Sequence, residues 1–447
     1  MPITKVDSRL RRIAMLLIVF IGISGVYSAR GLYSDGSHWL IEMLPRGGFF
    51  IFDPHRAFVQ ILEELPVVTA IWLGVLDLNV LIRAHSFGFI AIPLAFWLGA
   101  LWLHTRTNLF WFFILAFSVS YLRSGFFAAG EFSTAYAMTA FCAAILLSQR
   151  ISYLNGSLLV GTAIILIYSY EATAFLGIFL TVLVALRVLN HLENNIFNKL
   201  LMLFSAIIFM YGAYRGAQSM FFLRAYDASG PANFSAFAEI HLLYLMVVPA
   251  LMALSVSNHF YKYQKLLMVV LTGLPFIYLM YVFRWDHSNI SFGYLSYAYR
   301  ALCTFLLLGV LSIAVGIFYW PRLLGVQNEV TTSHFLSTTS MLFFLSMVLP
   351  FSYHTYGFYK WAQRFELEAV SIKSHVPIDK TTINSSHGWT DGYNWPWGNP
   401  STSILLRGNA EAIILNNSTH QGAEPVDHET IDKYPLKPFK KNSLLFP

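Results

Sequence analysis

Long apolar runs recur along the whole 447-residue chain and constrain its fold more than any other feature. About eleven runs reach 17 or more residues, which is the length that an α-helix needs to cross a hydrocarbon core of roughly 30 Å. A transmembrane β-barrel is disfavoured, because its strands would alternate apolar and polar residues over about ten positions. The sequence therefore predicts an all-α, polytopic membrane protein with about eleven transmembrane helices.

The composition agrees with a membrane location. Only 12% of the residues are charged, whereas a soluble domain carries about 25%. The formal net charge of +6 fits cations that flank membrane spans, and no basic tail or stripe of the kind that binds nucleic acid occurs, so no nucleic-acid partner is expected. Cys142 and Cys303 both lie in apolar runs and predict neither a disulfide framework nor a thiolate metal site.

Basic residues predict the orientation of the chain. Arg9, Arg11 and Arg12 precede the first apolar run, 13–29, which is predicted to be a retained signal anchor with a cytoplasmic N-terminus. Counted alternately from there, the short basic loops fall on the cytoplasmic side and the C-terminus lies outside, as expected for a multi-pass protein of a bacterial inner membrane. The expected spans are 13–29, 84–103, 108–127, 133–148, 151–168, 172–189, 200–220, 238–257, 265–283, 299–319 and 334–352.

Two further segments differ from the spans. The stretch 55–75 is apolar, but Arg56, Glu63, Glu64 and Pro66 interrupt it, which favours a helix lying along the membrane surface in the first outer loop. After the transmembrane part, 1–352, charges and Pro, Asn, Ser and Gly become frequent, which predicts a small exported segment over 353–447. Short strands are expected at 404–406 and 412–415.

Under this topology the unusual polar residues gather on the outer side. They are Asp35, His38 and Arg56 in the first outer loop, Glu131 in the second, Tyr170 and Glu171 in the third, and Arg284 and His287 in the fifth. Ionisable groups near membrane depth are costly and tend to mark functional sites. The clustering predicts a site on the outer face.

Each of these residues has a plainer alternative. Asp35 is a candidate general base, but Ser34 or Asp35 is equally placed to cap the short helix that follows. Glu131 is a second candidate acid, or it complements the dipole of the helix after it. Arg284 with His287 suits a phosphate, or Arg284 forms an ion pair with Asp286 at the membrane interface or reaches that interface from a span. These alternatives stay open on the sequence alone.

Metal and cofactor motifs are sparse. No pair of histidines has the spacing of a zinc site, so none is expected, whereas a divalent cation held by carboxylates such as Asp35 and Glu131 stays open. The sequence contains no phosphate-binding Gly-x-x-x-x-Gly-Lys-Ser/Thr loop, no dinucleotide Gly-x-Gly-x-x-Gly and no hydrolase Gly-x-Ser-x-Gly. The signals for an ATP-driven pump, a dinucleotide enzyme and a serine hydrolase are therefore missing.

The chain resembles the membrane glycosyltransferases of the GT-C superfamily. The resemblance rests on Tyr33-Ser34-Asp35-Gly36 just after the first span, on the long outer loop through 54–75, and on Gly130-Glu131 at the outer end of the third span. It implies an essential acidic residue in the first outer loop, which falls on Asp35, and a second acidic position, which Glu131 matches more loosely. It also implies a polyprenyl-phosphate sugar donor and a glycan or lipid acceptor on the outer face.

The residues and the resemblance together predict an inverting glycosyltransferase embedded in membrane lipids. Asp35 and Glu131 are the expected catalytic acids, and Glu171, Tyr170, Arg284, His287, Arg56 and His38 are expected to bind substrate. The alternative is a transporter or flippase of a lipid-linked or sugar substrate, which would use a similar charged cavity. A non-catalytic scaffold would need no convergent acids.

Overall fold

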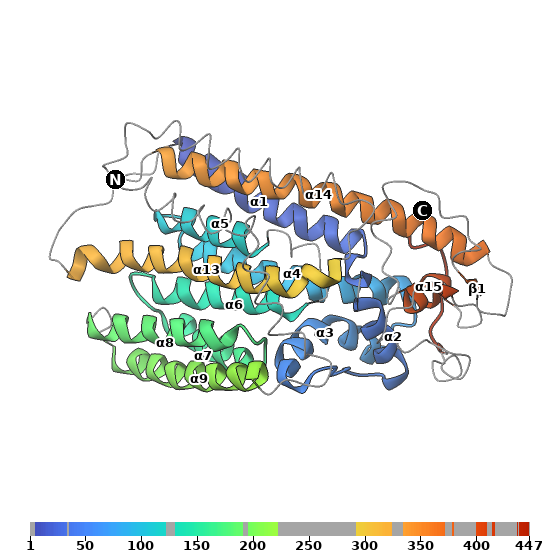
Figure 1. Ribbon diagram of the computed structural model, residues 1–447, viewed down its shortest axis with the longest axis horizontal. Coiled ribbons are helices and arrows are strands. Elements are labelled where there is room, and N and C mark those ends of the chain that lie inside the picture. Colours follow the sequence, from blue (N-terminus) through green and yellow to red (C-terminus); the bar gives the residue numbers. More distant parts are fainter. Residues whose placement is uncertain are drawn as a thin grey trace.

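Helices account for most of the described chain (Figure 1). The structure, a computed structural model, describes residues 5–33, 35–121, 130–190, 195–221, 292–323, 334–371, 378–379, 399–408, 414–415, 436 and 438–446. Within these ranges the only strands are two residues long, β1 (Ile378–Asp379) and β2 (Ile414–Leu415), and they pair in parallel. The prediction of a helical fold class is confirmed.

The helices follow one another with short connections where the chain is described. In chain order they are α1 (Lys5–Tyr27), the 3-10 turn η1 (Arg30–Leu32), α2 (Gly36–Arg46), the 3-10 turn η2 (Pro54–Arg56), α3 (Ala57–Trp72), α4 (Leu78–Leu103), α5 (Leu109–Ser120), α6 (Glu131–Leu146), α7 (Tyr153–Leu166), α8 (Thr173–Leu189), α9 (Ile196–Phe221), α13 (Phe292–Leu323), α14 (His334–Ser371) and α15 (Asn399–Arg407).

Four of the described helices contain a segment long and apolar enough to cross a membrane. These segments are Val6–Tyr27, Leu78–Leu103, Ile196–Ser219 and Leu336–Val370. Shorter apolar helices are Leu109–Ser120, Glu131–Leu146, Tyr153–Leu166, Thr173–Leu189 and Cys303–Tyr319. All of them overlap expected spans, while the expected spans 238–257 and 265–283 lie outside the described residues. The expected number of about eleven spans is therefore not confirmed.

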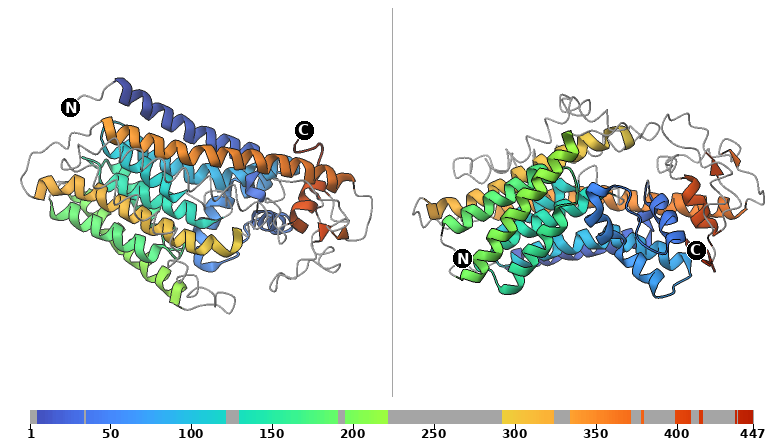
Figure 2. Two further views of the ribbon diagram at one scale, coloured as in Figure 1. Left: turned by 45° about the horizontal axis from the view of Figure 1, so that its top comes forward. Right: turned by 90° about the horizontal axis from the view of Figure 1, so that it is seen from below.

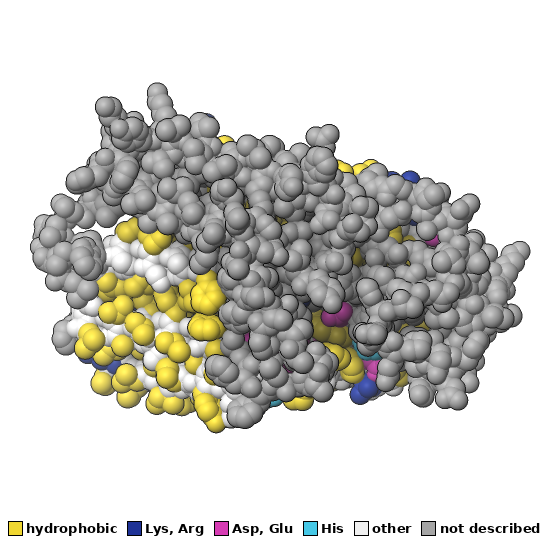
Figure 3. Space-filling model, in the orientation of Figure 1, with side chains coloured by type: hydrophobic (Ala, Val, Ile, Leu, Met, Phe, Trp, Pro, Cys, Tyr) yellow, Lys and Arg dark blue, Asp and Glu magenta, His cyan; other side chains and the backbone are white. Residues whose placement is uncertain are grey.

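The long helices run side by side around α6, every residue of which is buried. Helix α1 packs against α4 and α14 on one side, and α7, α8 and α9 form a group on the other (Figures 1 and 2). Hydrophobic side chains cover the surface of this second group (Figure 3). Apolar side chains on an outward surface suit contact with lipid.

Two buried arginines contact the C-terminal ends of α4 and α6. Arg11, on α1, donates to the carbonyl oxygen of Thr105 at 3.0 Å, just beyond α4. Arg187, on α8, donates to the carbonyl oxygens of Leu146 (2.7 Å) and Ser148 (2.6 Å) at the end of α6. A cation at a helix C-terminus interacts favourably with the helix dipole. These arginines thus connect neighbouring helices.

The helix expected in the first outer loop is present as α3, and its faces are unusual. The side that packs on the bundle carries Gln60, Glu63 and Glu64, each 0% exposed, whereas Ile61 and Trp72 on the other side are exposed. A helix with one face on the bundle and the other in water would bury apolar side chains and expose polar ones. Its placement along the membrane surface stays a prediction.

The last residues of the chain return to the bundle. Glu366, on α14, is buried and accepts hydrogen bonds from the backbone N–H groups of Leu445 (2.7 Å) and Phe446 (2.9 Å). The backbone N–H of Leu78, at the start of α4, donates to the carbonyl oxygen of Lys440 at 2.9 Å. Residues 438–446 therefore bridge α14 and α4.

The C-terminal part differs in detail from the expectation. The strand expected at 404–406 is wrong, because these residues lie in α15 and are all buried. A three-residue apolar run does not distinguish strand from helix, and Pro400 near the start of α15 suits a first helical turn. The strand expected at 412–415 is present in part as β2. The expected boundary at 352 falls within α14, and the division into 1–352 and 353–447 stays a prediction.

Candidate functional site

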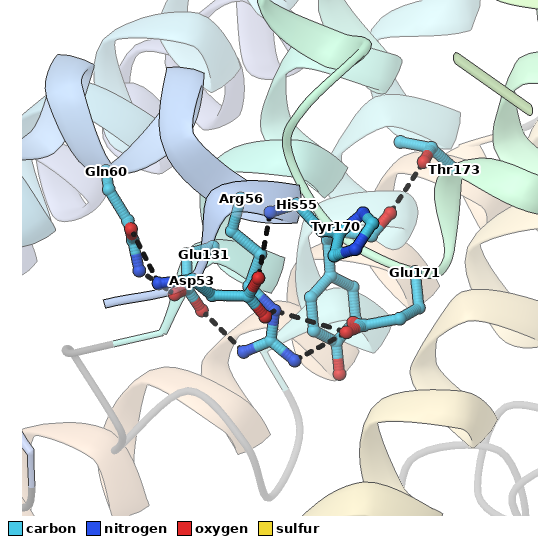
Figure 4. A network of polar contacts seen from close by, with 8 residues as sticks. All are labelled: Asp53, His55, Arg56, Gln60, Glu131, Tyr170, Glu171 and Thr173. Carbon is cyan, nitrogen blue, oxygen red and sulfur yellow. Dashed lines mark hydrogen bonds and ion pairs between the residues drawn. The ribbon is translucent and has the colours of Figure 1, made fainter. Parts of the chain in front are cut away.

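Arg56 is the centre of a polar network where α3, α6 and α8 begin (Figure 4). Its Nη2 lies 2.6 Å from Oε1 of Glu171, its Nη1 lies 3.3 Å from Oε2 of Glu131, and its Nε lies 3.6 Å from Oδ2 of Asp53. Its guanidinium carbon lies 5.2 Å from the centre of the Tyr170 ring. We call Asp53, Arg56, Gln60, Glu131, Tyr170 and Glu171 the Arg56 cluster. Three segments far apart in the sequence contribute to it, one at the start of α3, one at the start of α6 and one just before α8.

Glu131 is held through both carboxylate oxygens. Gln60 donates from Nε2 to Oε1 at 2.9 Å, and Arg56 donates to Oε2. Glu131 is also the first residue of α6 and is only 1% exposed. The positive end of the helix dipole favours a negative charge there. The position of Glu131 at the start of α6 is the one that the helix-dipole alternative requires, whereas its role as a second catalytic acid stays a prediction.

The chain before α3 positions the guanidinium. Asp53 accepts a hydrogen bond from the backbone N–H of His55 at 2.8 Å, and Pro54 begins the tight turn η2. The backbone N–H of Phe58 donates to the carbonyl oxygen of Tyr168 at 3.1 Å, so the start of α3 is attached to the loop between α7 and α8. This attachment sets Arg56 opposite Glu171.

The ion pairs keep Arg56 charged. Burial by itself would lower the pKa of the Arg56 guanidinium, but the neighbouring carboxylates of Glu171 and Glu131 outweigh burial and hold this pKa well above its ordinary value. Arg56 is therefore a permanent cation whose charge is shared among the carboxylates of Glu171, Glu131 and Asp53.

Two more buried carboxyl groups adjoin the cluster. Glu63 accepts a hydrogen bond from the hydroxyl of Thr134 through Oε1, and Glu64 accepts one from the backbone N–H of Phe50 at 2.8 Å through Oε2. Burial raises the pKa of Glu63 well above its ordinary value and that of Glu64 to about 8, and the charge of Glu131 adds to both shifts.

Asp35 and His38 lie on α2 or at its start. Asp35 occupies the N-cap position and is half-buried, but its side chain makes no capping hydrogen bond, so the alternative in which Asp35 caps the helix is wrong. The alternative in which Ser34 is the cap lies outside the described residues. Its place in a reaction stays a prediction. His38 packs edge-to-face on Phe50 with 5.9 Å between ring centres. Burial lowers the pKa of His38, and Glu42 opposes this shift.

The remaining expected site residues and metal ligands are not located. Arg284 and His287 lie outside the described residues. In the described part of the chain, no group of three or more His, Cys, Asp or Glu side chains is arranged to hold a metal ion. A divalent cation at Asp35 and Glu131 stays an untested expectation.

Sequence reasoning overlooked the polar face of α3. Gln60, Glu63 and Glu64 have i, i+3, i+4 spacing, which places them on one side of a helix. From the sequence, Glu63 and Glu64 were interpreted only as charges that interrupt an apolar run. Their helical spacing was the signal that pointed to a shared, inward-facing surface.

No family model, no curated protein and no solved structure matches this chain. The fold and the site define a helical chain with helices fit to cross a membrane and a buried ionic cluster at one end of its bundle.

Proposed function

We propose that the protein is a membrane glycosyltransferase that moves a sugar from a polyprenyl-phosphate donor to an acceptor on the outer face of the membrane. The observation that carries this proposal is the Arg56 cluster, a set of largely buried charges from three segments of the chain at one end of a bundle of apolar helices. Charged groups near a membrane are costly and tend to be kept where they serve a function. The resemblance of the sequence to the GT-C superfamily supplies the class of reaction.

Asp35 is the proposed general base. Its carboxylate is not used to cap a helix, unlike that of Asp77, which caps α4 through the backbone N–H of Asn79 at 2.8 Å. In the reaction, Asp35 takes the proton of the acceptor hydroxyl while the hydroxyl oxygen bonds to the anomeric carbon. The bond from that carbon to the phosphate oxygen breaks, and polyprenyl phosphate leaves with the electron pair. Attack opposite the leaving group inverts the configuration.

Arg56 and Glu131 have a positioning role in this proposal, in place of the substrate-binding and catalytic roles that the sequence predicts for them. Glu131 accepts hydrogen bonds on both oxygens, and Arg56 is paired with three carboxylates, so binding substrate through Glu131 or Arg56 would require an existing ion pair to break. We assign Glu171, the most exposed carboxylate of the cluster, and the neighbouring Tyr170 to the hydroxyls of the sugar. Arg284 and His287 are assigned to bind the leaving phosphate. His38 is assigned to bind the acceptor.

The test uses purified protein in detergent and a panel of radiolabelled polyprenyl-phosphate sugars. Release of lipid phosphate from one donor is expected for the wild type and is expected to disappear in Asp35→Asn. Asp77→Asn is the matched control, because asparagine caps a helix about as well as aspartate, and it should keep wild-type turnover. Near-normal turnover in a well-folded Asp35→Asn protein would refute the assignment of the base.

A transporter of a lipid-linked sugar is the second candidate. It is favoured by Glu63 and Glu64, because buried carboxyl groups that can hold protons serve proton-coupled transport. This candidate predicts saturable binding of a donor, no release of lipid phosphate, and binding that survives Asp35→Asn.

A further inference from the structure

We infer that Glu63 and Glu64 form a proton-binding pair, in which both side chains are neutral acids in the folded protein and couple the packing of α3 against α6 to pH. The inference does not depend on the proposed reaction. It rests on the number of charges in this region, on the contacts of each carboxyl oxygen and on what surrounds them.

The region holds more carboxyl groups than cations. Arg56 is the one guanidinium in the Arg56 cluster, while the carboxyl groups in and beside the cluster are those of Asp53, Glu63, Glu64, Glu131 and Glu171. Asp53 is 4% exposed, Glu131 1%, and Glu63 and Glu64 0%. Several like charges in a medium of low dielectric constant repel strongly unless protons neutralise some of them.

The hydrogen bonds identify which carboxyl groups carry the protons. Glu131 is paired with Arg56, whereas Glu63 and Glu64 make no ion pair within the described residues. In each of them one oxygen accepts a hydrogen bond, from Thr134 or from the backbone of Phe50, and the other, Oε2 of Glu63 or Oε1 of Glu64, is buried without a hydrogen-bond partner there. A buried oxygen that no donor stabilises favours the neutral acid over the carboxylate.

A proton suits this place better than a metal ion does. The described residues offer no group of three acidic or imidazole side chains with the spacing of a metal site. A proton needs one oxygen and no coordination shell. The unpartnered oxygens of Glu63 and Glu64 satisfy that requirement.

The groups around Glu63 favour the neutral, protonated form of its carboxyl group. Glu131 faces it from α6, and Tyr121 approaches from the end of α5. Helix α4 contacts the backbone of Glu63 at Gly88, and His85, on the same part of α4, directs its Nε2 to the carbonyl oxygen of Gly36 at 2.9 Å. The positive charge of Arg56 is engaged by Glu131 and Glu171.

Loss of these protons would place new negative charges beside Glu131, between α3 and α6. Repulsion there would weaken the packing that also positions Gln60 and Arg56 on Glu131. The pair therefore works as an alkaline switch on the Arg56 cluster. Glu64 is expected to lose its proton before Glu63.

Infrared spectroscopy of the full-length protein, with glutamate labelled by carbon-13, tests the pair directly. The carbonyl stretch of neutral carboxylic acids is expected at neutral pH in the wild type, to shrink by one acid in Glu63→Gln and by one in Glu64→Gln, and to stay unchanged in Glu42→Gln. Glu42 is a fair control because its carboxylate is paired with Arg46 at the surface.

Glutamine has the shape of a neutral glutamic acid, so both variants should fold. If one does not, the titration of the wild type decides alone, since part of the band should vanish as the pH is raised through about 8, the pKa of Glu64. The inference is overturned if the wild type shows no neutral-glutamate band at neutral pH, or if neither variant reduces it.

Discussion

Arg56 shows how a single side chain organises this end of the molecule. Its planar guanidinium presents several donors in fixed directions, which lets it pair with Glu131 and Glu171 at once. Removing it would leave these two carboxylates and that of Asp53 without their cation, and Glu131 and Asp53 are almost fully buried.

Arg56→Met is therefore expected to destabilise the protein by about 3–5 kcal/mol, the loss typical of breaking one side of a buried ion pair. Arg46→Met is the matched control, because the side chain of Arg46 is 54% exposed in its pair with Glu42 and such pairs contribute about 1 kcal/mol or less. The free energy of unfolding in mixed micelles measures both. Equal losses in the two variants would show that the Arg56 cluster is not a buried network.

The carboxyl group of Glu64 predicts how stability depends on pH. Its pKa is raised from an ordinary value of 4.5 to about 8 in the folded protein, so the folded state binds this proton more tightly than the unfolded state. Stability should therefore fall as the pH rises from 4.5 to about 8, by up to about 1.4 kcal/mol per pH unit.

The midpoint of thermal unfolding, followed across this range, should decline less steeply in Glu64→Gln than in the wild type. Glu42→Gln should keep the wild-type slope. Parallel curves for the wild type and Glu64→Gln would mean that Glu64 does not hold a proton in the folded protein.

The position of the Arg56 cluster depends on the close packing of α3 on α4. A Cβ atom added at Gly88 would lie 1.7 Å from the carbonyl oxygen of Glu63, too near for any rotamer to relieve. The backbones must therefore separate if Gly88 becomes larger, and the polar face of α3 would move with them.

Gly88→Ala is expected to destabilise the protein by at least about 1–3 kcal/mol, the usual range for overpacking. Gly161→Ala, in α7, is the control, because nothing lies within 4 Å of a Cβ there, and alanine should stabilise that helix by about 0.5–1 kcal/mol. Denaturant unfolding of both variants distinguishes the sites. A neutral Gly88→Ala would contradict the close approach of α3 and α4.

The helices were largely predictable from the sequence, because long apolar runs report local structure directly. Each described helix fit to cross a membrane overlaps an expected span. The error at 404–406 arose because a short apolar run fits a buried strand and a buried helix equally well. The inward side of α3 was detectable from the spacing of Gln60, Glu63 and Glu64. The helices that this side packs against were not.

The Arg56 cluster as a whole was not predictable in this way. Arg56 is separated from Glu131 by 75 positions and from Glu171 by 115, so these contacts depend on how whole helices pack. The sequence singled out all three residues as outer-side charges. It gave no reason to pair them with one another, and the roles assigned to Arg284 and His287 stay predictions.

At the scale of the whole molecule, residues 438–446 near the C-terminus connect α14 with α4. Glu366 is 0% exposed, accepts two backbone hydrogen bonds from the chain end and pairs with Lys441. Glu366→Gln should weaken all three contacts and leave the Lys441 charge without its partner.

Limited proteolysis with mass spectrometry measures this effect, since cleavage within 438–446 should become faster in Glu366→Gln while cleavage elsewhere is unchanged. Glu42→Gln should leave the tail as resistant as in the wild type. A tail that is cut at the same rate in all three proteins would contradict its docking on α14.

The fate of the bond between sugar and phosphate tests the proposed function most directly. In proteoliposomes with a donor labelled in both its sugar and its phosphate, a glycosyltransferase releases one polyprenyl phosphate for every sugar transferred, and Asp35→Asn abolishes both products together. Recovery of the intact donor on the opposite leaflet, with its sugar–phosphate bond unbroken, would contradict the account and establish a transporter.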